Sequence, residues 1–297
     1  MLAARYARYG PPEVIGIVEL PEPEPGPGEV LVALAAAGLN PADYKVRRGA
    51  APVRPLPSGI GREFAGTVLA LGPGAEGFSP GDEVIGTGEG VIGERIAAPV
   101  ALLARKPAGL DWRVAASIPV AVQTAACAVA SQSPGPDDTV LVSAAAGGVG
   151  YPAAQLARRT GARVLGTASR GNHERLRAIG VEPLEYGPGL AERLRALAPE
   201  GITIVLDHHG VETIEAALEL GVARERINTT AGYAERYAVR GVGRVGLDRE
   251  LVEELSHQLL EGELEIRLDR SFGLADLVEA YRRLEEGRPA GKVVIVF

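Results

Sequence analysis

The segment 144–150, with the sequence AAAGGVG, has the residue types that can hold a phosphate group. An apolar run, TVLVSA, precedes it, and a segment with helical spacing (148–160) and a second apolar run, ARVLGTAS, follow. This order predicts the strand, turn, helix and strand of a Rossmann fold. Gly147 and Gly148 would let the backbone approach a pyrophosphate, and Gly150 would allow close packing. Ala144 stands where the commoner pattern has its first glycine.

The helix that follows would present free N–H groups and a positive dipole end to the phosphates. We therefore predict a dinucleotide site that includes Ala146, Gly147, Gly148 and Val149. The alternative is a glycine-rich bend in an α/β protein that binds nothing.

The end of the second predicted strand indicates which nicotinamide cofactor would bind. NAD sites usually place an acidic residue there for the ribose 2′-OH, but this chain has Thr167-Ala168-Ser169-Arg170. A serine hydroxyl and a guanidinium suit a 2′-phosphate, so the sequence favours NADPH. The alternative is that Arg170 is only a solvated loop residue.

The surrounding elements predict two domains. Residues 1–118 contain short apolar runs separated by glycine and proline, which is typical of a β-rich unit. Residues 119–268 alternate strands such as ITIVLD with helices near 173–180, 190–197 and 211–220, the pattern of a covered parallel sheet. Residues 269–297 supply a helix, LADLVEAYRRLEEG, and a last strand, KVVIVF.

Composition excludes several classes of partner and location. The net charge is −7 and there is no run of lysine or arginine, so we expect no nucleic-acid or acidic-membrane surface. The single cysteine, Cys127, permits no internal disulfide, which fits a reducing cytoplasm, and we expect it to be a small core residue. The first residues lack the apolar core of a signal peptide, and no apolar stretch is long enough for a membrane helix.

Several motifs in order resemble the quinone oxidoreductase-like group of zinc-independent medium-chain dehydrogenases/reductases. They are YGPPEV, PGPGEVLV, GLNPADYKVRRG, GREFAGTV, GFSPGDEV, AAAGGVG and GKVVIVF. The resemblance implies an α/β fold with a Rossmann domain and a GroES-like β domain formed by both chain ends. It also implies a homodimer that binds NADPH in the cleft between its domains.

The same resemblance implies roles for individual residues. Asn40, with Tyr44 and Lys45 nearby, would line the nicotinamide and substrate end of the cleft. Residues matching the positions that hold the cofactor are Thr124, the turn residues Gly147, Gly148 and Val149, the 2′-phosphate group Ser169, Arg170 and Tyr186, and the loop residues Thr230, Ala231 and Gly232.

Zinc is not expected. The zinc branch needs Cys, His and Glu ligands, whereas this chain has no histidine before His173 and a single cysteine. Arg62 stands where that branch carries a ligand histidine. Without a metal, hydrogen bonds must polarise the substrate, and Asn40, Tyr44 and Lys45 are candidate donors.

His208 and His209 follow ITIVLD, at a strand end where open α/β sheets bind ligands. His208 could be a proton donor, or both could be exposed loop histidines. His173 and His257 lie in predicted helices and are expected to be exposed.

The predicted function is NADPH-dependent hydride transfer to a small-molecule quinone or α,β-unsaturated carbonyl. One alternative is an enone or enoyl reductase that tailors a natural-product intermediate. Another is a paralogue that binds NADPH without turnover.

Overall fold

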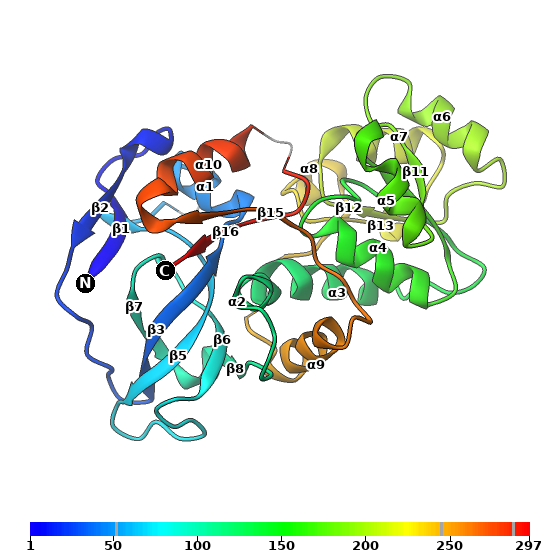
Figure 1. Ribbon diagram of the computed structural model, residues 1–297. Helices are drawn as coiled ribbons and strands as arrows, with labels where there is room; N and C mark the ends of the chain where they lie inside the picture. The colour runs from blue at the N-terminus through cyan, green and yellow to red at the C-terminus, as the bar shows by residue number, and fades with distance from the viewer. Residues whose placement is uncertain (51–52, 244–245, 287–288) are drawn as a thin grey trace. The chain divides into compact units, whose positions relative to one another are not determined.

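The computed structural model describes residues 1–50, 53–243, 246–286 and 289–297. The chain forms two compact units (Figure 1). Unit 1 contains Met1–Gln123, Val245–Glu263 and Leu268–Phe297, and unit 2 contains Thr124–Arg244 and Leu264–Arg267. Both chain ends therefore belong to unit 1. Internal contacts define these units, and the predicted boundaries at 118 and 268 stay predictions.

Unit 1 is built from two sheets. The smaller has the order β2-β1-β4 (Ile15–Glu19, Leu2–Tyr6, Ser58–Gly59), with antiparallel pairing throughout. The larger has the order β15-β16-β3-β5-β6-β8, and β7 also pairs with β3. Their bounds are β15 Leu268–Gly273, β16 Lys292–Val296, β3 Glu29–Gly38, β5 Glu63–Leu71, β6 Glu83–Thr87, β8 Leu103–Arg105 and β7 Arg95–Pro99.

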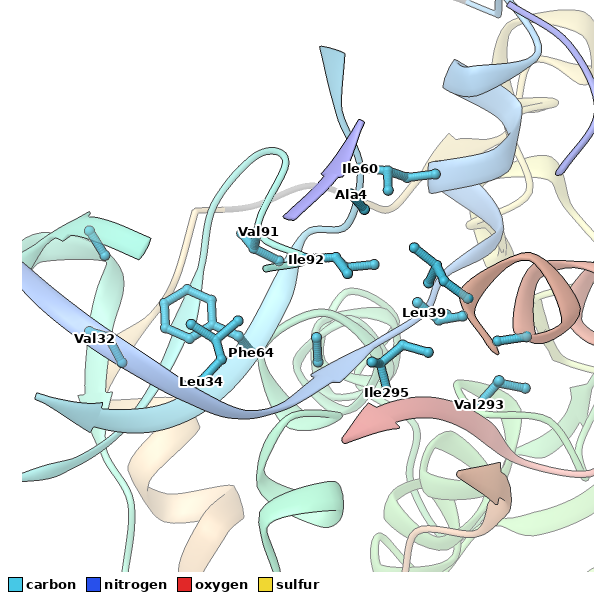
Figure 2. Close-up of a cluster of buried hydrophobic side chains, with 14 of the residues drawn as sticks. Ala4, Val32, Leu34, Leu39, Ile60, Phe64, Val91, Ile92, Val293 and Ile295 are labelled. Carbon is cyan, nitrogen blue, oxygen red and sulfur yellow. The ribbon is translucent and has the colours of Figure 1, made fainter. Parts of the chain in front are cut away.

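The last strand, β16, pairs antiparallel with β3, which explains how residues from both chain ends share one core. Figure 2 shows Leu34 and Phe64 on neighbouring strands, with Ile295 of the last strand in the same buried cluster. The helices of unit 1 are α1 (Pro41–Arg47), α2 (Trp112–Ala115), α9 (Arg249–Leu260) and α10 (Leu277–Glu285).

Unit 2 has one six-stranded parallel sheet, in the order β11-β10-β9-β12-β13-β14. Numbered within the unit, this is 3-2-1-4-5-6, the order of a dinucleotide-binding Rossmann sheet. The bounds are β9 Thr139–Val142, β10 Arg163–Thr167, β11 Glu182–Leu184, β12 Ile204–Asp207, β13 Ile227–Thr229 and β14 Arg240–Gly241. The predicted α/β fold class is confirmed.

Most helices of this part of the chain follow the sequence pattern, although the short helix at Ala234–Tyr237 was not predicted. The helices are α3 (Gln123–Ala130), α4 (Gly150–Arg159), α5 (His173–Ala178), α6 (Leu190–Leu197), α7 (Val211–Glu219) and α8 (Ala234–Tyr237). Cys127 is half-buried on α3. None of the helices in the described residues is long and apolar enough to span a membrane.

The prediction for the two helix histidines is half right. His257 is exposed on α9. His173 is half-buried, because it begins α5 and its Nε2 lies 3.2 Å from the Ala168 carbonyl oxygen.

Candidate active site

The glycine turn between β9 and α4 has a strained but well-defined backbone. Ala144 has a φ of +47°, in the left-handed region that glycine adopts most readily. Its carbonyl oxygen accepts a 2.8 Å hydrogen bond from Gly147 N–H. A Cβ on Gly150 would lie 2.2 Å from that same oxygen, so only glycine fits there. The close packing predicted for Gly150 is therefore a contact within the turn, between Gly150 and the backbone of Ala144 and Ala145.

This turn leaves backbone donors available. Among the described residues, the backbone N–H groups of Gly148 and Val149 donate no hydrogen bond. They precede Gly150, where the ten-residue helix α4 begins. Ala146 is buried beside them. Free N–H groups at a helix N-terminus form an anion site, so the turn fits a cofactor pyrophosphate.

The ends of β10 and β11 bring Ser169, Arg170 and Tyr186 to one edge of the sheet. Arg170 is 83% exposed, and its Nη2 donates to Glu185 Oε2 at 2.9 Å. Ser169 Oγ accepts from Asn172 Nδ2 at 3.0 Å. Sequence reasoning missed Glu185, although it directly precedes Tyr186. The guanidinium is accessible to a phosphate but shares its site with a carboxylate.

A buried aspartate organises the centre of the same sheet edge. Asp207 ends β12 and is fully buried. It accepts hydrogen bonds from Ser143 Oγ at 2.7 Å and Thr229 Oγ1 at 2.6 Å, which follow β9 and end β13 respectively. It also accepts from the backbone N–H groups of His209 and Gly210. Asp207 therefore fixes the ends of three neighbouring strands where the strand order reverses.

His208 lies directly after that aspartate. Its backbone N–H donates to Ser143 Oγ at 2.7 Å, and its Nδ1 lies 3.1 Å from Thr230 Oγ1. Its Nε2 is buried and has no hydrogen-bond partner among the described residues. Burial lowers the pKa of His208 to about 4, with the opposing attraction of Asp207 the smaller effect. The imidazole is therefore neutral at pH 7.

The remaining cofactor candidates also belong to unit 2. Ala231 N–H donates to Thr229 Oγ1 at 3.1 Å, and Gly232 is exposed with a φ of +93°. The structure thus brings Thr230, Ala231 and Gly232 to one loop, adjacent to His208. Thr124 is half-buried on α3.

In unit 1 the predicted residue Asn40 belongs to a buried polar cluster. Lys292 Nζ donates to Asn40 Oδ1 at 2.9 Å and to Glu63 Oε1 at 2.6 Å. Asn40 Nδ2 donates to the same carboxylate oxygen at 2.9 Å. The other oxygen of Glu63 accepts from Val120 N–H at 2.8 Å. Asn40 is therefore held in one orientation by two oppositely charged side chains.

Tyr44 and Lys45 lie on α1, the helix that Asn40 caps. Asn40 N–H donates to Asp43 Oδ2 at 2.8 Å, and Asp43 N–H donates to the Asn40 backbone carbonyl oxygen at 3.0 Å. Tyr44 is half-buried against the core of unit 1, and Lys45 is exposed. The structure brings these three candidates to one short segment, while His208 belongs to the other unit.

Asp43, on α1, is a buried carboxylate that sequence reasoning missed, as it missed Glu63. Asp43 accepts from Tyr281 Oη at 3.4 Å and pairs with Arg62, whose Nε lies 3.3 Å from Asp43 Oδ1. Burial raises the pKa of Asp43 to about 6, although the Asn40 N–H and the charge of Arg62 oppose the shift. Among the described residues, no group of three or more His, Cys, Asp or Glu side chains could hold a metal ion.

Comparison with known proteins agrees with this architecture. Residues 26–108 match the alcohol dehydrogenase GroES-like domain, and residues 181–295 match the zinc-binding dehydrogenase model. Erythronolide synthase EryA2 of Saccharopolyspora erythraea is 34% identical over 290 residues, which are 90% of this chain but 8% of that protein. The chain thus spans a small part of the polyketide synthases it matches. The 2-methylene-furan-3-one reductase of Solanum lycopersicum is 30% identical over 99% of this chain and 79% of its own length.

Solved structures match over the whole chain. The quinone oxidoreductase of Coxiella burnetii has a TM-score of 0.90 at 30% identity, covering 100% of this chain and 99% of that one. A mycobacterial protein complexed with NADPH has a TM-score of 0.88 at 30% identity, and an NAD-dependent alcohol dehydrogenase has 0.88 at 32%, each covering 100% of both chains. This chain belongs to the medium-chain dehydrogenase/reductase family of oxidoreductases, and its predicted likeness to the quinone oxidoreductase-like group is confirmed.

Proposed function

We propose that the protein is an NADPH-dependent, zinc-independent reductase of quinones or α,β-unsaturated carbonyls. The observation that carries the proposal is the glycine turn, whose Gly148 and Val149 N–H groups precede α4 at the centre of a 3-2-1-4-5-6 sheet. A turn of this kind at the strand-order reversal is the usual place for a dinucleotide pyrophosphate. When bound, the reduced nicotinamide would supply a hydride.

NADPH rather than NADH is proposed from the end of β10. Arg170 is mostly exposed and can donate two parallel hydrogen bonds to a phosphate. Glu185 opposes the preference for NADPH, because its carboxylate accepts a hydrogen bond from the Arg170 guanidinium and would repel a 2′-phosphate. The similar structures include both an NADPH complex and an NAD-dependent enzyme. We assign the preference to Arg170, with Ser169 and Tyr186 beside it.

The substrate would accept the hydride at an electrophilic carbon, and negative charge would develop on its carbonyl oxygen. The Asn40 amide oxygen accepts from Lys292, and one of its two amide N–H groups donates to Glu63. The second N–H could therefore donate to the substrate carbonyl oxygen. Tyr44 and Lys45 are the proposed sources of the balancing proton. His208 would contribute a hydrogen bond rather than a proton, because its imidazole is neutral at pH 7.

A second candidate function is reduction of an enone or enoyl intermediate in natural-product synthesis. The similarity to polyketide synthases and to the tomato reductase favours it. We further propose a cytoplasmic homodimer, on the single cysteine and the family resemblance.

The test is titration of the protein with NADPH and NADH, followed by NADPH oxidation with quinones, enones and enoyl thioesters. Tighter NADPH binding and steady turnover with one acceptor class are expected. Binding without any turnover would favour the non-catalytic paralogue. If neither nucleotide binds, the proposed function is wrong.

A further inference from the structure

The segment 264–267, which belongs to unit 2, is held against α4 by a buried glutamine. Gln155 Nε2 donates to the Glu265 carbonyl oxygen at 2.8 Å, and Glu265 N–H donates to Gln155 Oε1 at 2.9 Å. Tyr151 Oη also donates to Glu265 Oε2 at 3.2 Å. These three hydrogen bonds fix the segment to the helix that follows the glycine turn.

This attachment brings Arg267 to the proposed 2′-phosphate site. Arg267 Nη1 donates to Asn172 Oδ1 at 2.7 Å, and Asn172 Nδ2 donates to Ser169 Oγ at 3.0 Å. A single side-chain amide therefore connects the guanidinium to the serine hydroxyl. Arg267 lies 95 positions after Asn172, so no local pattern in the sequence indicates this contact.

The contact with Asn172 leaves the Ser169 hydroxyl able to donate to an anion. Ser169 is exposed, and its Oγ accepts from Asn172. A hydroxyl that accepts one hydrogen bond still has its own O–H to donate. Because Asn172 is held by Arg267 at its other end, the amide keeps its Nδ2 toward Ser169 and its oxygen toward the guanidinium.

Positive charge lies on two sides of this hydroxyl. Arg170 follows it directly, but Arg170 pairs with Glu185 at 2.9 Å, and that carboxylate weakens the attraction of Arg170 for an anion. Arg267 adds a second positive charge on the Asn172 side, where its 2.7 Å contact is with a neutral amide. The attraction between charges extends over several ångströms near a protein surface, so Arg267 can act on a phosphate bound at Ser169.

We propose that Arg267 is a specificity-determining residue for the 2′-phosphate of NADPH, and that Asn172 aligns it beside Ser169. This inference rests on the proposed function and deepens it by naming a second cationic residue at the same site. It explains how a preference for NADPH survives the nearby carboxylate of Glu185. A nucleotide without the 2′-phosphate would gain nothing from Arg267.

The test uses two probes that differ only in the 2′-phosphate, adenosine 2′,5′-bisphosphate and adenosine 5′-monophosphate. Their binding to the full chain is measured by calorimetric titration. The parent protein should bind the bisphosphate more tightly. Arg267→Met should lower bisphosphate affinity about 5- to 20-fold, because an attractive charge is lost, and should change monophosphate affinity less than about twofold.

Three further variants separate the charge of Arg267 from its structural contact. Arg267→Lys keeps the charge and should keep most of the bisphosphate preference. Arg267→Gln keeps an amide donor without the charge and should lose the preference as Arg267→Met does. Arg177→Met is the matched control, because Arg177 is an exposed arginine on α5 and its removal changes the net charge equally. It should bind both probes as the parent protein does, and thermal unfolding checks that each variant is folded.

The outcomes distinguish this inference from the proposed function. If the parent protein prefers the bisphosphate and Arg267→Met or Arg267→Gln keeps that preference, only the role of Arg267 is wrong. Equal losses of both probes in Arg267→Met, or equal bisphosphate losses in Arg267→Met and Arg177→Met, would also overturn that role. If the parent protein binds the bisphosphate no more tightly than the monophosphate, the NADPH assignment fails and this inference fails with it.

Discussion

Lys292 Nζ donates a 2.6 Å hydrogen bond to Glu63 Oε1, joining the last strand of the chain to β5 in a region where both side chains are almost fully buried. Two charges out of water are tolerated only when each is paired and hydrogen-bonded. Here Lys292 also donates to the Leu39 carbonyl and Asn40, while Glu63 also accepts from Val120. The pair thus ties together four segments of unit 1 and orients Asn40.

Removal of one charge should therefore be costly. Lys292→Met leaves Glu63 buried without its counter-charge, and we expect unfolding free energy to fall by about 3–5 kcal/mol. Glu63→Gln combined with Lys292→Met should recover part of that loss. Urea unfolding of the parent, both single variants and the double variant measures the coupling. A double variant that loses the sum of the two single losses would show that the charges do not stabilise each other.

The local parts of this architecture were predictable from the sequence, because strand and helix periodicities depend on near neighbours. The AAAGGVG turn and the strand ITIVLD are examples, and both have the predicted structure. Lys292 and Glu63 are 229 positions apart, and no local pattern connects them. Their only signal was that each is a charged residue at the start of an apolar strand.

The same limit applies to the two sites. Asn40 could be predicted from a family motif, but its partners could not, because they come from β5 and β16. Glu185 was missed because the sequence gives no register between the ends of β10 and β11, which the parallel pairing of Leu165 with Glu182 sets. Asp207 ends the predicted strand ITIVLD. Its role in joining three strand ends depends on hydroxyl groups of Ser143, after β9, and Thr229, in β13, which a local pattern does not reveal.

The Arg170–Glu185 pair should control cofactor preference. Arg170→Asp should weaken NADPH binding about 10- to 100-fold while changing NADH binding little, because only NADPH carries the 2′-phosphate. Glu185→Gln should tighten NADPH binding severalfold, since it removes a competing carboxylate. Fluorescence titration with both nucleotides measures these affinities. Equal losses of NADPH and NADH in Arg170→Asp would remove the 2′-phosphate assignment.

The glycine turn should not tolerate a methyl group at position 150. Gly150→Ala places a Cβ 2.2 Å from the Ala144 carbonyl oxygen, so the turn must shift and the donors of Gly148 and Val149 move with it. We expect at least a tenfold loss of nucleotide affinity together with lower stability. Gly135→Ala is the matched control, because a Cβ there meets nothing within 4 Å. Unchanged NADPH affinity in Gly150→Ala would argue against this turn as the pyrophosphate site.

His208 should make the protein less stable as the pH falls. Its pKa is about 4 in the folded protein and near 6.5 when unfolded, so the unfolded chain binds the extra proton between these values. The stability contribution of neutral His208 is therefore complete above about pH 6.5 and is lost as the pH falls toward 4. We expect a loss of about 2 kcal/mol from this group between pH 7 and pH 5. Urea unfolding at both pH values should show a smaller loss for His208→Asn than for the parent. His257→Asn, at an exposed position on α9, should behave as the parent does. If His208→Asn and the parent lose the same free energy, His208 is not buried as a neutral group, and its role as a proton donor becomes tenable again.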